Sequence, residues 1–142
     1  MLEFGTRAAN VHYIDRPGAY AVIRNPQDEV AVIRTPNGYF LPGGGVDSGE
    51  EFEAALRREV LEETGLGVRI SKKIGVAAQY LVSAREGIHY KKVGHFYLAD
   101  FADRISETFE AEHELLWMSP AQAGSSLNHQ FQVWALGIAA HA

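Results

Sequence analysis

The stretch that decides the fold is Leu41–Leu66, which reads LPGGGVDSGEEFEAALRREVLEETGL. It begins with a leucine, a proline and three glycines, a run in which a helix cannot start early. Ser48 is a typical N-cap residue, and Glu51, three positions later, completes a capping box. Gly65 is suited to ending a helix. We therefore predict a glycine-rich loop followed by a helix over Gly49–Thr64.

Three acids of this helix, Glu59, Glu62 and Glu63, fall within an arc of about 100°. Acidic helices are most often solvated surfaces with weak ion pairs. Here, however, like charges one turn apart repel each other, which a helix selected only for stability would avoid. A divalent cation removes the conflict, because Mg²⁺ prefers oxygen ligands from carboxylates, water and phosphate. The pattern therefore favours a metal site.

The same stretch resembles the Nudix box, whose pattern is G-x5-E-x7-R-E-U-x-E-E-x-G-U, with U an aliphatic residue. Every defined position is filled, by Gly44, Glu50, Arg58, Glu59, Val60, Glu62, Glu63, Gly65 and Leu66. Only one frame fits, because a start at Gly45 would need an arginine where Glu59 stands. The resemblance implies an α/β/α sandwich with a mixed central sheet and the box helix against one sheet face.

Length and composition set further bounds. The 142 residues are 46% hydrophobic and 22% charged, which indicates one globular domain over residues 1–142. The net charge of −5 argues against binding of duplex nucleic acid, which needs a basic face. The absence of cysteine excludes disulfides, thiolate catalysis and zinc–thiolate sites.

The chain shows no targeting or membrane signal. Its start, MLEFGTRAAN, lacks the basic stretch and apolar run of a secretory signal. No apolar run approaches the length that spans a bilayer. We therefore expect a cytoplasmic protein without a membrane partner.

Strand patterns surround the predicted helix. Ala19–Arg24 and Glu29–Arg34 form a predicted hairpin, since Asn25–Asp28 has turn chemistry. Residues 1–16 are predicted to be an edge strand or a loosely held tail, and residues 103–112 a polar loop. Further extended segments are predicted over 39–41, 68–82 with an interruption near Gly75, 88–101 and 115–118.

A final helix is predicted to begin with Ser119 as its cap and Pro120 at its first position. We expect a break around residues 124–128. The apolar residues Phe131, Trp134, Ala135 and Ile138 have helical spacing and are predicted to be core. Strands on both sides of a helix, followed by a terminal helix, indicate an α/β layered domain.

The resemblance also implies a chemistry. Nudix proteins cleave a nucleoside diphosphate linked to another moiety, by attack of water at phosphorus with Mg²⁺ or Mn²⁺. Glu59 and Glu63 would be the principal metal ligands, and Glu62 a third ligand or a holder of the water. The carbonyl of Gly44 is a candidate backbone ligand. Arg58 is expected to face away from these acids.

Arg58 and Glu50 are expected to form an ion pair that braces the loop, as the corresponding residues do in the family. The general base is left open between Glu59 and three loop acids, Glu110, Glu112 and Glu114, which are otherwise ordinary solvated acids. Among the loop acids we favour Glu112.

Candidate substrate-binding residues are Arg34, Tyr39, Phe40 and Lys92, with Lys91 and His95 on the same predicted strand as Lys92. The histidines His12, His89, His113 and His129 lack zinc-ligand spacing, so none is assigned to a metal.

The expected function is therefore magnesium-dependent hydrolysis of a nucleotide derivative. The candidates are a damaged nucleoside triphosphate, ADP-ribose or another nucleotide sugar, and a dinucleoside polyphosphate. The alternative is a non-catalytic nucleotide sensor on the same fold, but sensors usually lose acids that this chain keeps. A homodimer is expected only because many relatives pair up.

Overall fold

The computed structural model describes residues 1–107 and 110–141, which form eight strands and three helices. The strands are β1 (Leu2–Phe4), β2 (Ile14–Arg24), β3 (Val30–Thr35), β4 (Gly38–Phe40), β5 (Gly43–Gly45), β6 (Leu66–Ser83), β7 (Ile88–Arg104) and β8 (Glu114–Met118). The helices are α1 (Phe52–Thr64), α2 (Pro120–Ser126) and α3 (Gln130–Ala139). No helix in this part of the chain is long and apolar enough to cross a bilayer.

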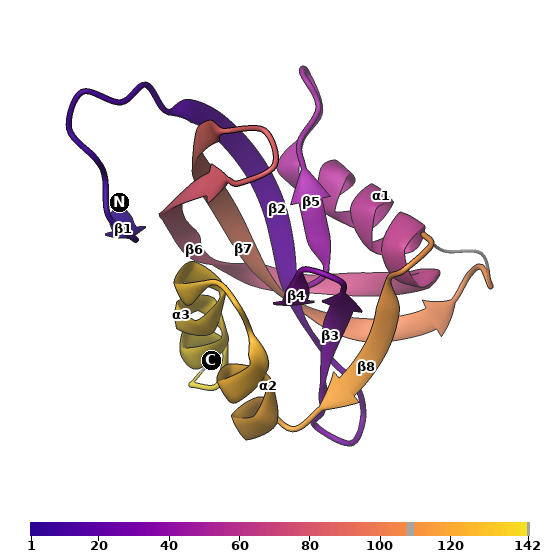
Figure 1. The fold of residues 1–142 in the computed structure, drawn as a ribbon. Coiled ribbons are helices and arrows are strands. Elements are labelled where there is room, and N and C mark those ends of the chain that lie inside the picture. Colours follow the sequence, from indigo (N-terminus) through magenta and orange to yellow (C-terminus); the bar gives the residue numbers. More distant parts are fainter. Residues whose placement is uncertain (108–109, 142) are drawn as a thin grey trace.

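The strands form one mixed sheet in the order β1-β6-β7-β2-β3-β4, with β5 paired to β2 and β8 to β3. The long strands β2 and β7 run parallel, whereas β6 and β7 are antiparallel. Helix α1 lies on one side of the sheet, and α2 and α3 lie on the other (Figure 1). The predicted layered arrangement is confirmed.

The hairpin of β2 and β3 opens immediately after its turn. Only Arg24 and Val30 are paired between the two strands. From there β2 pairs with β5, and the amide of Ala21 donates to the carbonyl of Pro42 over 3.0 Å. The glycine-rich segment predicted as a loop is therefore partly a strand, inserted where β2 and β3 diverge.

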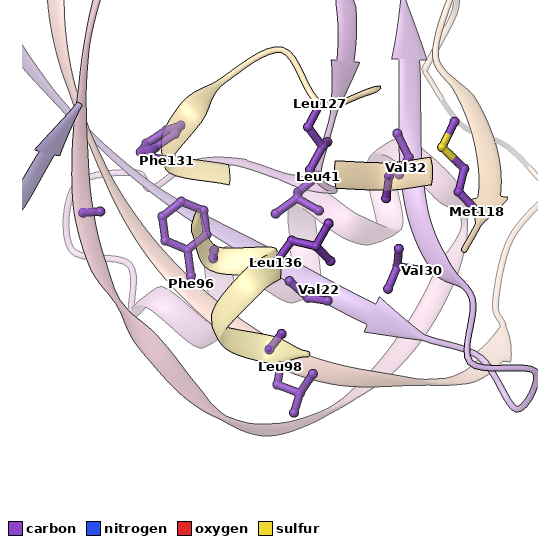
Figure 2. Packing of buried hydrophobic residues seen from close by; sticks show 14 residues of the cluster. Val22, Val30, Val32, Leu41, Phe96, Leu98, Met118, Leu127, Phe131 and Leu136 are labelled. Atoms are coloured by element: carbon purple, nitrogen blue, oxygen red, sulfur yellow. The ribbon is translucent and has the colours of Figure 1, made fainter. Parts of the chain in front are cut away.

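Two cores lie on the opposite faces of the sheet. Alternate residues of β2 serve both, since Val22 packs towards α3, while Ala21 and Ile23 pack towards α1. Figure 2 shows the larger core, in which Phe96 of β7 meets Phe131 of α3. Their ring centroids are 5.2 Å apart in an edge-to-face arrangement. These cores fix both helical layers against one sheet.

Helix α1 begins three residues later than predicted. Its N-cap is Glu51, which makes no side-chain capping hydrogen bond, so the predicted Ser48 capping box is wrong. The reason is a tight turn: Gly49 has φ +80°, and the amide of Glu50 donates to the carbonyl of Asp47. At the other end Gly65 has φ +74° and stops the helix as predicted.

Most other expected elements are confirmed, with shifted ends. β1 is an edge strand, β6 has register shifts of which the last lies between Lys73 and Gly75, and the final helix breaks between α2 and α3. The Ser119 hydroxyl accepts the predicted cap bond, from the amide of Gln122. The predicted polar loop at 103–112 starts later, because β7 continues to Arg104; positions 108 and 109 lie outside the described residues.

Ile138 is a wrong core assignment. Phe131 and Ala135 are fully buried and Trp134 packs against the core, but Ile138 is 43% exposed. Ile138 lies at the edge of the buried face, about 60° from Ala135 and about 100° from the buried Ala139, in the last turn of α3.

Phe131→Ala should lower the free energy of unfolding by about 3–5 kcal/mol, because it leaves a cavity in place of a fully buried ring. Ile138→Ala, on the same helix, is the matched control and should change it by only about 0.5 kcal/mol. Urea denaturation followed by circular dichroism measures both. Equal losses would contradict the buried face assigned to α3.

Candidate active site

A cleft of about 710 Å³ is lined by residues of the sheet, of α1 and α3, and of the loops around residues 35–37 and 111–113. A volume of this size is typical of small-molecule sites. The cleft joins five predicted site residues: Phe40, Gly44, Glu63, Lys92 and Glu112. Glu63 is the only acid of α1 on its wall.

Glu63 is the most buried acid of the site, with 8% of its surface exposed. Its Oε1 accepts a hydrogen bond from the amide of Gly43 over 2.8 Å. Burial raises the pKa of Glu63 to about 8, with the neighbouring carboxylates of Glu110, Glu59 and Glu62 adding to the rise. The Gly43 amide opposes this rise. The Gly43 amide therefore holds the carboxylate in place, but ionising Glu63 without a cation nearby costs free energy.

Three further carboxylates, Glu59, Glu62 and Glu110, have oxygens within 4.8 Å of one another. Burial raises the pKa of Glu59 too, against the lowering effect of Arg58. Together with Glu63, these residues form what we call the carboxylate cluster. The structure thus brings the three predicted acids of α1 to one place and adds a loop acid.

Gly44 lies against this cluster, as the sequence predicts. A Cβ atom at position 44 would come within 2.5 Å of Oε2 of Glu59. The strand pairing of Gly44 with Ala19 fixes the backbone here, so a side chain at position 44 would displace the carboxylate of Glu59.

Arg58 pairs with Glu50 as predicted, through Nε at 2.9 Å and Nη2 at 2.8 Å. These bonds lower the pKa of Glu50 to about 2. The prediction that Arg58 faces away from the acids is wrong: its Nη1 also lies 2.9 Å from Glu59 and 3.4 Å from Glu62. The planar guanidinium has five donors, enough to serve both the loop and the cluster.

The loop before β8 supplies the added acid. The amide of Glu110 donates to the carbonyl of Glu62 over 3.1 Å, which docks the loop on α1. Among the described residues, Glu112 belongs to no group of three ligands, although it lines the cleft. Glu114 is ion-paired with Arg34. Of the three loop acids, Glu110 is therefore the one beside the cluster.

His113 also reaches the acids. Its Nδ1 lies 3.2 Å from Oε2 of Glu63 and 3.3 Å from Oε2 of Glu110. This nitrogen is buried, yet it makes no hydrogen bond of acceptable geometry with any described residue. Zinc-type spacing could not reveal this contact, because the partners of His113 come from α1 and from the loop itself.

The cleft also has a cationic and aromatic wall. Lys92 has no hydrogen bond or ion pair among the described residues, and burial, with Arg16 nearby, lowers its pKa. His129 lies beside Phe40, with ring centroids 5.0 Å apart. Burial, aided by the charge of Lys92, lowers the pKa of His129 to about 4, so the ring is neutral at pH 7.

Two predicted substrate-binding residues do not line this cleft. Tyr39 packs against the larger core, and its amide donates to Asn128. Arg34 lines a separate, shallower hollow together with Glu110 and Glu112. Arg34 and Tyr39 thus lie close to the glycines in the sequence but do not reach the cleft in the fold. The two other candidates on β7 have partners of their own: Lys91 pairs with Glu3, and His95 stacks on Phe52.

The residues fit a divalent cation. The cluster offers hard oxygen donors, the neighbouring carboxylates raise the pKa of Glu63, and the glycine at position 44 leaves space beside Glu59. A bound cation offsets the repulsion between such carboxylates. Glu59, Glu62, Glu63 and Glu110 are the residues that would hold it.

The metal-free protein should lose stability as the pH rises from about 5 to 8. The folded state holds a proton on Glu63 up to about pH 8, whereas the unfolded chain releases it near 4.5. The free energy of unfolding therefore falls as the pH rises across this window. Urea unfolding with a chelator present, at several pH values, measures the slope. Glu63→Gln should flatten it, and Glu53→Gln, an exposed acid of the same helix, should not. An unchanged slope in Glu63→Gln would contradict the assignment.

The chain matches known proteins in sequence and in fold. The NUDIX domain family matches residues 14–139. A putative 8-oxo-dGTP diphosphatase of Bacillus subtilis (strain 168) is 41% identical over 61 residues, which cover 42% of this chain and 41% of the relative. Nudix hydrolase 7 of Arabidopsis thaliana is 30% identical over 123 residues, covering 80% of this chain and 42% of the relative. The matched region thus spans less than half of each relative.

Among solved structures, the MutT protein of Methanosarcina mazei Go1 superimposes with a TM-score of 0.73 at 21% identity, over 93% of this chain and 98% of that one. This likeness confirms the α/β fold with a mixed central sheet and three helices within the described residues. Together with the match over residues 14–139, it leaves one conclusion: the chain belongs to the Nudix family.

Proposed function

We propose that this protein is a pyrophosphohydrolase that cleaves a nucleoside diphosphate linked to another moiety, with Mg²⁺ as its cofactor and Mn²⁺ as a substitute. The observation that carries this proposal is the carboxylate cluster beside a cleft of nucleotide size, with Glu63 on the wall of that cleft. A nucleotide entering the cleft would present its phosphates to the cluster and its base or sugar to the remaining wall.

The cation would be held by Glu59, Glu62, Glu63 and Glu110, with the carbonyl of Gly44 as a further candidate ligand. When bound, a divalent ion draws charge from the phosphoryl oxygens and lowers the pKa of the attacking water. The protein's part is to position these ligands: Gly43 fixes one oxygen of Glu63, and Arg58 fixes Glu59.

For the general base we favour Glu112, because it lines the cleft and, among the described residues, belongs to no group of three ligands, whereas Glu110 is placed among the ligands of the cation. Glu59 is less suited to this role, since its carboxylate is already bonded to Arg58. A base must reach the proton of the attacking water, and that water must lie next to the cation.

Substrate binding is assigned to Phe40 and Lys92. Phe40 and the neutral His129 offer an aromatic wall for a nucleobase, and Lys92 is a cation free to meet a phosphate or a base oxygen. The Bacillus subtilis relative bears the name putative 8-oxo-dGTP diphosphatase, so nucleoside triphosphates, damaged ones included, are the first substrates to test. Nucleotide sugars and dinucleoside polyphosphates come next.

The alternative, a non-catalytic nucleotide sensor, is less well supported. A sensor needs the cleft and its aromatic wall but gains nothing from four carboxylates that destabilise one another. A panel of nucleotides assayed with Mg²⁺ and Mn²⁺, with products identified by chromatography, separates the two. Nucleotide binding without hydrolysis across the panel would favour the sensor.

Glu63→Gln should abolish Mg²⁺-dependent hydrolysis while leaving the fold intact, because the amide keeps the shape of the side chain but removes the charge that holds the cation. Glu53→Gln is the matched control, since it removes one exposed acid from the same helix. Initial rates with each substrate cleaved by the wild type measure the effect. Full activity in Glu63→Gln would remove this residue from the metal site.

Lys92→Met should raise KM by about tenfold or more with little change in kcat, because a charge-assisted bond to the substrate is typically worth about 1.5–3 kcal/mol. Lys72→Met, which removes an exposed lysine from β6, should leave both constants unchanged. Steady-state kinetics on the best substrate measure the split. A fall in kcat at constant KM would show that Lys92 does not act by binding the substrate.

A further inference from the structure

We propose that Glu63, Glu110 and His113 form a second cation position, which shares Glu110 with the position between Glu59, Glu62 and Glu110, and that it selects a first-row transition-metal ion such as Mn²⁺ through the imidazole of His113. This inference rests on the proposed use of the carboxylate cluster to bind divalent cations. It adds a nitrogen ligand that the box does not contain.

The spacing of the three donors fits a shared ion. Nδ1 of His113 is 3.2 Å from Oε2 of Glu63 and 3.3 Å from Oε2 of Glu110. Two neighbouring ligands that each lie about 2.1 Å from one ion are separated by about 3.0 Å in octahedral and about 3.4 Å in tetrahedral coordination. Both separations from His113 fall between these values, and the two carboxylate oxygens lie within 4.8 Å of each other, so a small movement of the side chains lets one ion reach all three atoms.

The nitrogen is available for such an ion. Nδ1 of His113 is buried and, despite its closeness to two carboxylates, makes no hydrogen bond of acceptable geometry with the described residues. A buried polar atom without a partner is costly, and a structure normally satisfies it. A metal ion between His113 and the acids would satisfy the nitrogen and neutralise the carboxylates together.

The remaining bonds of the two acids leave the right atoms free. Glu63 uses Oε1 for the amide of Gly43, which leaves Oε2 directed at His113. The amide of Glu110 is bonded to the carbonyl of Glu62, and the amide of His113 lies 3.4 Å from the carbonyl of Glu110. The loop that carries two of the ligands is therefore docked on the helix that carries the third.

The donor set decides which metal the position prefers. Imidazole is a good ligand for transition-metal ions, whereas Mg²⁺ prefers oxygen donors throughout. Glu59, Glu62 and Glu110 offer oxygens alone, but the position at His113 offers one nitrogen and two oxygens. The two positions should therefore differ in metal preference, with the transition metal at His113.

The test is pulsed electron paramagnetic resonance of Mn²⁺ bound to the full chain, with isothermal titration of Mn²⁺ and Mg²⁺ in parallel. The wild type should show coupling of Mn²⁺ to an imidazole nitrogen. His113→Ala should lose that coupling and weaken the tightest Mn²⁺ binding by at least about tenfold, since losing even a partner behind a ligand typically costs that much. Mg²⁺ binding should change less.

Two further variants make the outcome specific. His12→Ala removes an exposed histidine and should keep both the nitrogen coupling and the Mn²⁺ affinity. His113→Asp replaces the nitrogen by an oxygen donor and should restore binding while shifting the preference towards Mg²⁺. Circular dichroism on each variant confirms that the fold is retained.

The readouts separate this inference from the proposed function. Mn²⁺ binding without nitrogen coupling, or with unchanged affinity in His113→Ala, overturns the ligand role of His113 even if hydrolysis is observed. Nitrogen coupling that depends on His113 supports it even if no substrate on the panel is cleaved. Absence of any Mn²⁺ binding overturns it together with the metal site.

Discussion

One hydrogen bond holds the two halves of the site together: the amide of Gly43 in β5 donates to the buried carboxylate of Glu63 near the end of α1. A Cβ atom at Gly43 would collide with the backbone of Ala19 and Tyr20, so the strand can approach β2 this closely only without a side chain. The bond fixes the carboxylate of Glu63 against β5. Glu63 therefore faces the cleft, with Glu59 and Glu62 on the turns of α1 before it.

Burial of these acids makes their ionised forms less stable, and other residues of the site reduce this cost. The pKa of Glu63 rises because water is excluded and because like charges gather around it. Arg58 relieves part of the repulsion, since it spans the turn at Glu50 and the acids Glu59 and Glu62. On the proposed function, the remaining negative charge would draw a cation and, through the cation, a phosphate.

The part of this site that is local in sequence could be predicted from the sequence. The acids of α1, the Glu50–Arg58 pair and the stop at Gly65 all lie within one segment whose spacing is governed by helix geometry. The start of α1 was not predictable in the same way, because two local signals competed there. The turn at Gly49 prevailed over the Ser48 capping box.

The contacts that depend on distant segments were not predictable. Glu110 and His113 reach the cluster because a loop docks on the end of α1, and nothing in their own sequence distinguishes Glu110 from Glu112. His129 and Lys92 meet in the cleft because the break before α3 places one beside a strand that carries the other. Such placements require the tertiary fold.

β5 consists of three glycines, so beside the acids the cleft is walled by bare peptide groups. Peptide groups offer the same hydrogen bonds to every phosphate chain and cannot tell one nucleotide from another. Discrimination must then fall to the rest of the wall, which is formed by Phe40, Lys92 and His129 and by the outlying loops around residues 35–37, 83–86 and 111–113. On the proposed function, substitutions in those loops can therefore change which nucleotide the protein accepts, while the carboxylate cluster and the glycines of β5 stay as they are.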